Sequence, residues 1–185
     1  MVNLEKGQRI DLTKGNSGLT KLCLGLGWDV NKSNSGDFDL DAFVLALDDQ
    51  NKLIADAVCY YGNLKMLNES VCHSGDNLTG VGDGDDETVT ISLDKVPANV
   101  QKLVVYANIY KAQERSQNFG MVRNAFVRCY DGNTKNELLR YDLGEEYSTF
   151  QGVVFGEVYR AGGEWKFAAQ SNGFNGDTNS LLQMY

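Results

Sequence analysis

Short runs of alternating apolar residues, separated by glycine-rich turns, limit what this chain can fold into more than any other feature. In Leu22–Trp28, LCLGLGW, the leucines and the tryptophan share one face, and a cysteine and two glycines share the other. A period of two residues is that of a β-strand, and a glycine-rich face leaves room for another segment to pack closely. The chain has 20 glycines and one proline, which favours strands joined by turns over helices.

The same periodicity predicts further strands. Thr88–Leu93, TVTISL, alternates cleanly with its apolar residues inward, whereas Phe38–Leu47 and Lys102–Tyr110 are apolar on both faces, as covered strands are. Residues 111–122 have helical composition, enough for one or two short turns. The other predicted strands are Arg9–Leu12, Ile54–Tyr61, Val71–His73, Ala125–Tyr130, Leu138–Leu143, Gly152–Tyr159 and Trp165–Ala169. About ten short strands with little helix predict an all-β, two-sheet β-sandwich.

Length and charge define the class of protein. A chain of 185 residues suits one domain, which we expect over residues 1–170, with 171–185 as a flexible or loosely docked tail because that stretch is rich in Asn, Gly and Ser. The formal net charge of -8 argues against nonspecific nucleic-acid binding, which depends on basic surface. The sequence shows no apolar run of transmembrane length and no signal-peptide core, so a cytoplasmic protein is expected.

The stretch Gly75–Glu87, GDNLTGVGDGDDE, concentrates carboxylates and neutral oxygen donors between four glycines, without lysine or arginine. Two carboxylates about 4 Å apart repel by roughly 4 kcal/mol at the effective dielectric of a protein surface, so a bound cation is expected. Ca²⁺ takes roughly 6 to 8 oxygen ligands in flexible geometry, whereas Mg²⁺ demands an octahedron and keeps its waters. Calcium is therefore the first hypothesis, and a solvated acidic loop is the alternative.

A second acidic segment, DFDLDA at residues 37–42, begins the predicted strand Phe38–Leu47. Its three aspartates share one face, about 6.6 to 6.8 Å apart, and could line a pocket wall. An EF-hand loop is excluded, because Ala42 stands where the loop needs glycine. A sandwich gathers its loops at two ends, so the two segments can meet, with enough ligands for two adjacent Ca²⁺ ions. The candidate metal ligands are Asp29, Asp37, Asp39, Asp41, Asp76, Asn77, Asp83, Asp85, Asp86 and Glu87.

The cysteines and the single histidine argue against other site chemistries. Cys23, Cys59, Cys72 and Cys129 are widely spaced without a CxxC pair, so we expect reduced and mostly buried thiols rather than a zinc or thioredoxin-type site. His73 is the only histidine, and a Ser/His/Asp or Cys/His mechanism would have to be built on it. We therefore expect no enzymatic activity.

Six stretches, in order along nearly the whole chain, share the pattern of one known family. They are LGLGWD (24–29), DFDLDA (37–42), SGDNLTGVGDGDDE (74–87), QNFGMVRNAFVR (117–128), LLRYDL (138–143) and FGEVYRAGGEWKF (155–167). With these stretches the chain resembles the TerD family of tellurite-resistance and stress-response proteins. The resemblance implies a Ca²⁺-binding β-sandwich, with ligands in both acidic segments and no established enzymatic activity. One departure is Val81, where relatives often have glutamate; if that glutamate is a ligand, one site is weaker here.

The leading hypothesis is a non-enzymatic, calcium-binding module that contacts other proteins of the stress-response and tellurite-resistance system. The inner face of a membrane is one candidate location for these contacts. Two alternatives belong to other classes: a Ca²⁺-dependent membrane-docking domain like a C2 domain, and a dimetal hydrolase with bridging carboxylates. A receptor for a small molecule such as cAMP rests on fold analogy alone, because some slime-mould cAMP-binding proteins carry a similar domain.

Overall fold

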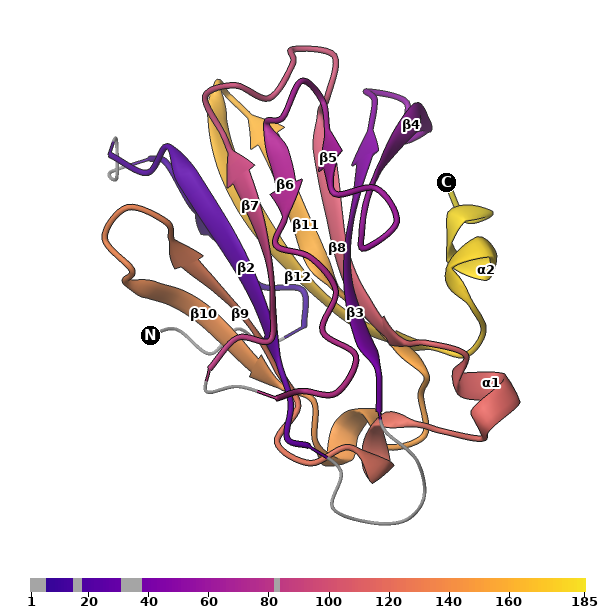
Figure 1. Ribbon diagram of the computed structural model, residues 1–185. Coiled ribbons are helices and arrows are strands. Elements are labelled where there is room, and N and C mark those ends of the chain that lie inside the picture. Colours follow the sequence, from indigo (N-terminus) through magenta and orange to yellow (C-terminus); the bar gives the residue numbers. More distant parts are fainter. Residues whose placement is uncertain (1–5, 15–17, 31–37, 82–83) are drawn as a thin grey trace.

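The predicted β-sandwich is confirmed: two six-stranded antiparallel sheets pack face to face (Figure 1). The computed structural model describes residues 6–14, 18–30, 38–81 and 84–185. The first sheet has the order β1 (Arg9–Asp11), β12 (Glu164–Phe174), β11 (Gly152–Ala161), β8 (Lys102–Ile109), β3 (Leu40–Leu47) and β4 (Leu53–Cys59). The second has the order β10 (Glu137–Asp142), β9 (Phe126–Asp131), β2 (Lys21–Gly27), β7 (Glu87–Ser92), β6 (Val71–His73) and β5 (Lys65–Met66).

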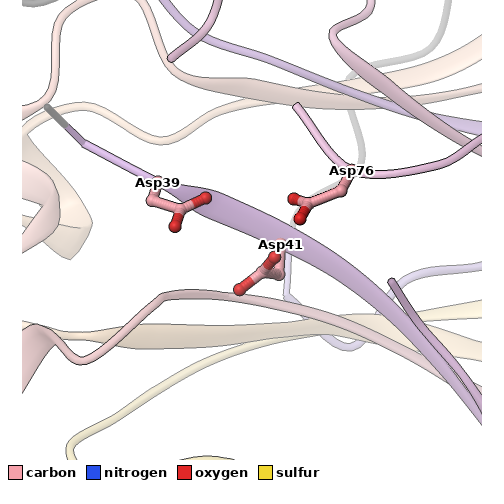
Figure 2. A group of neighbouring side chains, drawn as sticks. All are labelled: Asp39, Asp41 and Asp76. Atoms are coloured by element: carbon pink, nitrogen blue, oxygen red, sulfur yellow. The ribbon is translucent and has the colours of Figure 1, made fainter. Parts of the chain in front are cut away.

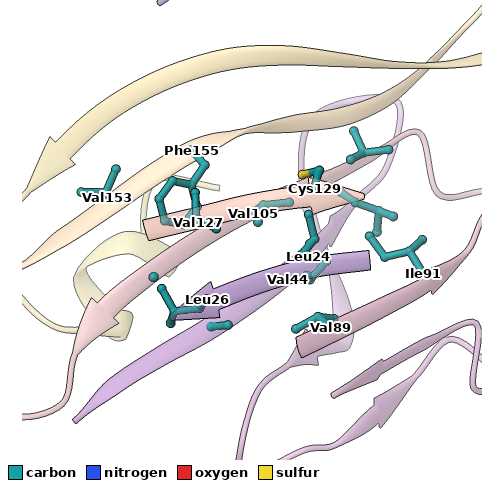
Figure 3. Packing of buried hydrophobic residues seen from close by; sticks show 14 of the residues in the cluster. Leu24, Leu26, Val44, Val89, Ile91, Val105, Val127, Cys129, Val153 and Phe155 are labelled. Atoms are coloured by element: carbon teal, nitrogen blue, oxygen red, sulfur yellow. The ribbon is translucent and has the colours of Figure 1, made fainter. Parts of the chain in front are cut away.

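The core lies between the sheets and follows the alternation of the sequence. Leu24 and Leu26 of β2 and Val89 of β7 point from the second sheet toward Val44 of β3 and Val105 of β8 (Figure 3). All five side chains are at most 3% exposed. Fully burying a Val or Leu side chain contributes roughly 1.5–3 kcal/mol, so this inner layer fixes how the two sheets face each other.

Helical structure is confined to short pieces, as the sequence predicted for residues 111–122. They are α1 (Ala112–Arg115), α2 (Thr178–Leu182) and the 3₁₀ turns η1 (Phe119–Met121) and η2 (Glu145–Tyr147). No helix in the described residues is long and apolar enough to cross a membrane. The two-residue strand β5 was not predicted, because a stretch of that length carries no periodicity.

The C-terminal segment, predicted as a flexible or loosely docked tail over residues 171–185, contains regular structure. Strand β12 continues to Phe174, and α2 then packs on the outer face of the first sheet. Leu181 of α2 is 1% exposed and belongs to a second apolar cluster that includes Phe43 of β3 and Tyr106 of β8. This cover explains why β3 is buried on both faces. The Asn, Gly and Ser composition of this segment gave no signal for the burial of Leu181, which packs the segment against the sheet.

Candidate metal site

The candidate site lies at the end of the sandwich where β3 and β7 begin, the lower end in Figure 1. Strand β4 pairs with β3 only from Val44 onward, so the first residues of β3 have a strand neighbour, β8, on one side. On the open side, the backbone N–H of Ala42 donates to Glu87 Oε2 at 2.8 Å. Glu87 Oε1 in turn accepts from the N–H of Asn77 at 3.3 Å. One carboxylate therefore fastens the acidic loop to the start of β3.

Three carboxylates converge at this place. Asp39 and Asp41 lie at the start of β3, Asp76 lies on the loop, and ligand oxygens from the three side chains are within 4.8 Å of one another (Figure 2). Asp39 and Asp41 are 6% and 2% exposed, whereas Asp76 is open to solvent. We call these three residues the carboxylate cluster. The sequence prediction that the two acidic segments meet is confirmed for these three residues.

The cluster is electrostatically costly without a cation. Burial raises the pKa of Asp41 to about 9, and the neighbouring charges of Glu87, Asp39 and Asp76 add to the effect. Burial also raises the pKa of Asp39 to about 6, helped by the charge of Asp76 and opposed by that of Arg115. The Oδ1 atom of Asp39 is buried and finds no hydrogen-bond partner among the described residues. Buried hard oxygens with unsatisfied acceptor capacity fit a cation such as Ca²⁺.

Glu87 and His73 form a fully buried support beneath the cluster. Both side chains are 0% exposed, and His73 Nε2 lies 3.3 Å from Glu87 Oε2. The N–H of Gly75 donates to His73 Nδ1 at 3.0 Å, which leaves Nε2 as the ring nitrogen that faces Glu87. Glu87 was predicted as a metal ligand; in the structure its oxygens accept hydrogen bonds from two segments and face the histidine.

Asn77 and Asp86 give the acidic loop its shape. Asn77 Oδ1 accepts from the N–H groups of Thr79 and Gly80, and its Nδ2 donates to Asp86 Oδ1 at 3.1 Å. Asp86 Oδ2 accepts from the N–H of Trp28 at 2.9 Å. Gly80 has a φ of +69° and is pressed against the Trp28 ring, a position open only to glycine. Hydrogen bonds among its own polar groups and to Trp28 thus hold the described part of the loop in shape.

Asp85 and Asp29 are bound to groups other than the cluster. Asp85 accepts two hydrogen bonds from Arg128, from Nε at 2.7 Å and from Nη2 at 3.0 Å. The Asp85 carboxyl lies against Gly25 of β2, where an added Cβ would overlap it. The predicted close approach to the glycine-rich face of β2 is therefore confirmed. Asp29 is exposed and accepts from Asn124 Nδ2 at 2.8 Å.

Two predicted ligands, Asp37 and Asp83, lie outside the described residues. Sequence analysis did not anticipate Arg128, the partner of Asp85, because the two are 43 residues apart and no local pattern joins them. It gave His73 no role next to Glu87, although both residues begin or end strands beside the acidic loop. The glycines of β2 were the one sequence signal for the Asp85 contact, because a strand face without side chains leaves room for another group to pack on it.

One known protein family matches this chain along its whole length. The family model of the TerD domain matches residues 1–185. The chain belongs to the TerD family. It is 50% identical over 186 residues to general stress protein 16U of Bacillus subtilis (strain 168), covering all of this chain and 96% of that protein. It is 42% identical over 185 residues to the tellurium resistance protein TerD of Serratia marcescens, with coverage of 100% and 96%.

The fold of the TerD family is also found among solved structures. A homologue of telluride resistance protein (TerD) from Streptomyces coelicolor A3(2) superposes with a TM-score of 0.78 at 21% sequence identity, covering 89% of this chain and 96% of that one. At this identity the likeness supports the fold alone. Membership of the TerD family thus rests on the sequence relatives, which include proteins named for tellurium resistance and for general stress.

Proposed function

We propose that this TerD-family chain is a non-enzymatic calcium-binding module of a stress-response system that includes tellurium resistance. Calcium binds the carboxylate cluster and orders the loop end of the sandwich into a surface that partner proteins recognise. The observation that carries this proposal is the convergence of Asp39, Asp41 and Asp76, two of them buried, within 4.8 Å. No Lys or Arg forms an ion pair with any of the three in the described part of the chain.

The chemistry of the donors favours calcium over other metals. Carboxylate oxygens are hard ligands, and three of them, some bidentate and completed by water, approach the roughly 6 to 8 oxygens that Ca²⁺ takes. Soft metals prefer thiolates and imidazoles. Burial of His73 against Glu87 supports a binding role over catalysis, because the chain's only imidazole is enclosed below the cluster.

Calcium titration tests the proposal. At 100 times its dissociation constant, calcium should stabilise the protein by about 2.7 kcal/mol per site, which is roughly 5 to 10 °C in melting temperature for a chain of this size. Calorimetric titration measures the affinity, and melting curves with calcium and with chelator measure the shift. Absence of both heat and shift in the wild-type protein would contradict the proposal.

Two variants locate the site. Asp41→Asn keeps the size of the side chain and removes a central ligand charge, so it should abolish the calcium-dependent shift while the protein still folds. Asp49→Asn is the matched control, because Asp49 is an exposed aspartate in the turn after β3. A shift of equal size in wild type and Asp41→Asn would place calcium elsewhere.

A second candidate function, calcium-dependent docking to a membrane surface, is favoured by one observation. Leu78 and Val81 lie in the acidic loop and are 57% and 68% exposed. Apolar loop tips next to a cation site can enter the headgroup region while the ion bridges to anionic lipid. Sedimentation with phosphatidylserine vesicles tests this: binding that requires calcium and is lost in Leu78→Ser/Val81→Ser supports it. Met184→Ser, which alters an exposed methionine in the C-terminal segment, is the control.

A further inference from the structure

Asn108 stands beside the carboxylate cluster. It lies on β8 directly opposite Asp41 on β3. Opposed residues of antiparallel strands point to the same face with their Cβ atoms about 4.5–5.5 Å apart. Asn108 is 6% exposed, and its Oδ1 atom has no hydrogen-bond partner among the described residues. An unsatisfied buried acceptor costs about 1–3 kcal/mol, and an amide oxygen is an accepted ligand of Ca²⁺.

The other end of the same amide reaches the C-terminal helix. Asn108 Nδ2 donates to Oγ1 of Thr178, the first residue of α2, at 3.4 Å. This bond is longer than the usual 2.7–3.2 Å, so it has room to shorten. Apart from this bond, α2 is held on the sheet by the buried Leu181, and after the helix the carbonyl of Tyr185 accepts from the N–H of Leu53 at 3.4 Å.

We infer that Asn108 couples the proposed calcium site to the docking of α2. The ion takes Oδ1, and because the amide is planar this orients Nδ2 toward Thr178 and shortens their hydrogen bond. Without the ion nothing binds the amide oxygen, so the amide is not oriented toward Thr178. The helix α2 is then held more weakly over the outer face of the sheet, where Phe43 and Tyr106 lie. The inference rests on the proposed function and adds a consequence of it: calcium controls how tightly this face is covered.

Coupling of this kind is reciprocal. If calcium strengthens the docking of α2 by some factor through the Asn108–Thr178 hydrogen bond, removal of that bond weakens calcium binding by the same factor. Couplings between sites typically amount to about 5–150-fold, and a single hydrogen bond belongs at the lower end, about fivefold. Both sides of the relation are measurable on the full-length chain.

Hydrogen exchange of the peptide covering residues 175–185, with calcium chloride and with chelator, tests the coupling. The backbone amides that form hydrogen bonds there, which include those of Leu181, Gln183, Met184 and Tyr185, should exchange about fivefold more slowly with calcium. Calorimetry on the same sample measures calcium binding first. If calcium does not bind, the proposed function fails; if it binds and the exchange of this peptide does not change, only the coupling fails.

Three variants separate ligation from helix stability. Asn108→Leu removes the amide oxygen and the donor, so it should weaken calcium binding and abolish the calcium-dependent protection of α2. Thr178→Val keeps Asn108 and should still bind calcium, about fivefold more weakly, without protection of α2. Ser180→Ala is the matched control: Ser180 contacts Asp177 at the helix start, so its loss loosens α2 equally with and without calcium.

Two outcomes with these variants would overturn the inference. Equal calcium affinity in wild type and Asn108→Leu would show that Oδ1 is not a ligand. Calcium-dependent protection of α2 that survives in Thr178→Val would show that the Asn108–Thr178 bond does not carry the coupling. If Asn108→Leu fails to fold, Thr178→Val alone still decides, because its hydroxyl lies at the partly exposed start of a surface helix.

Discussion

At the residue scale, the site consists of carboxylates that differ in burial and in partners. Glu87 is enclosed and fully engaged by two backbone donors, whereas Asp39 and Asp41 are buried with their charges facing each other. In the metal-free protein such a pair is accommodated by protonation, because like charges and burial both disfavour the ionised form. Calcium and protons therefore compete for the same oxygens.

This competition predicts a pH dependence with a definite sign. The folded-state pKa values, about 6 for Asp39 and about 9 for Asp41, lie above the ordinary value of 3.8. Their contribution to stability is fully present below about pH 4 and is lost as pH rises through 6 and then 9. With chelator present, the melting temperature should therefore fall from pH 5 to pH 9. Calcium affinity should rise over the same range, because binding releases protons.

Melting curves of wild type and Asp41→Asn at pH 5, 7 and 9 check this expectation. The asparagine variant cannot ionise, so the upper part of the decline, between pH 7 and 9, should be smaller. Titration in buffers of different ionisation enthalpy counts the protons that calcium displaces. Parallel curves for the two proteins would show that Asp41 ionises normally in the folded state.

At the element scale, most strands could be predicted because burial follows period-two alternation. Most predicted ends fall within a few residues of the observed ones, whereas β12 was predicted to end at Ala169 and continues to Phe174. The site could be predicted only in part. Asp39, Asp41 and Asp76 meet because β3 and β7 begin at the same end of the sandwich, which the sandwich topology implies. The partners Arg128 and Asn108 come from β9 and β8, and which strand neighbours which is decided by tertiary pairing that no local pattern encodes.

The substitution Gly25→Val tests how closely the acidic loop packs on β2. Valine has a higher strand propensity than glycine by up to about 1 kcal/mol, but its Cβ would overlap the Asp85 carboxyl. Overpacking of this kind costs about 1–3 kcal/mol, so Gly25→Val should lower the free energy of unfolding and displace Asp85 from Arg128. Urea unfolding measures the change.

Two further variants control the Gly25 experiment. Gly18→Ala should change stability by less than about 0.5 kcal/mol, because an added Cβ there meets no atom within 4 Å. Adding Asp85→Ala to Gly25→Val removes the overlapping carboxyl and should recover part of the loss. A Gly25→Val protein as stable as wild type would mean that the loop moves away from β2 without cost.

At the scale of the whole molecule, the acidic residues divide into two groups around Glu87. Besides burial, the charges of Glu87, Asp39 and Asp76 raise the pKa of Asp41. Besides burial, those of Asp85, Glu87 and Asp29 raise the pKa of Asp86. The first group is the carboxylate cluster. The second already has a cation, because Arg128 holds Asp85 in a two-point ion pair. Two Ca²⁺ ions would halve the formal charge of -8, but the second must compete with a guanidinium.

Counting bound ions by native mass spectrometry therefore distinguishes the groups. In wild type the first ion should bind the cluster and a second only at higher calcium, and Asp41→Asn should lose the tighter one. Arg128→Met should strengthen the second ion, since it frees Asp85 while keeping an unbranched side chain over Tyr130. Arg140→Met is the control, because Arg140 pairs with Asp142 on β10. If Arg128→Met leaves the second ion unchanged, Asp85 is no ligand, and the Asp85–Arg128 pair serves only to fasten the loop to the sheet.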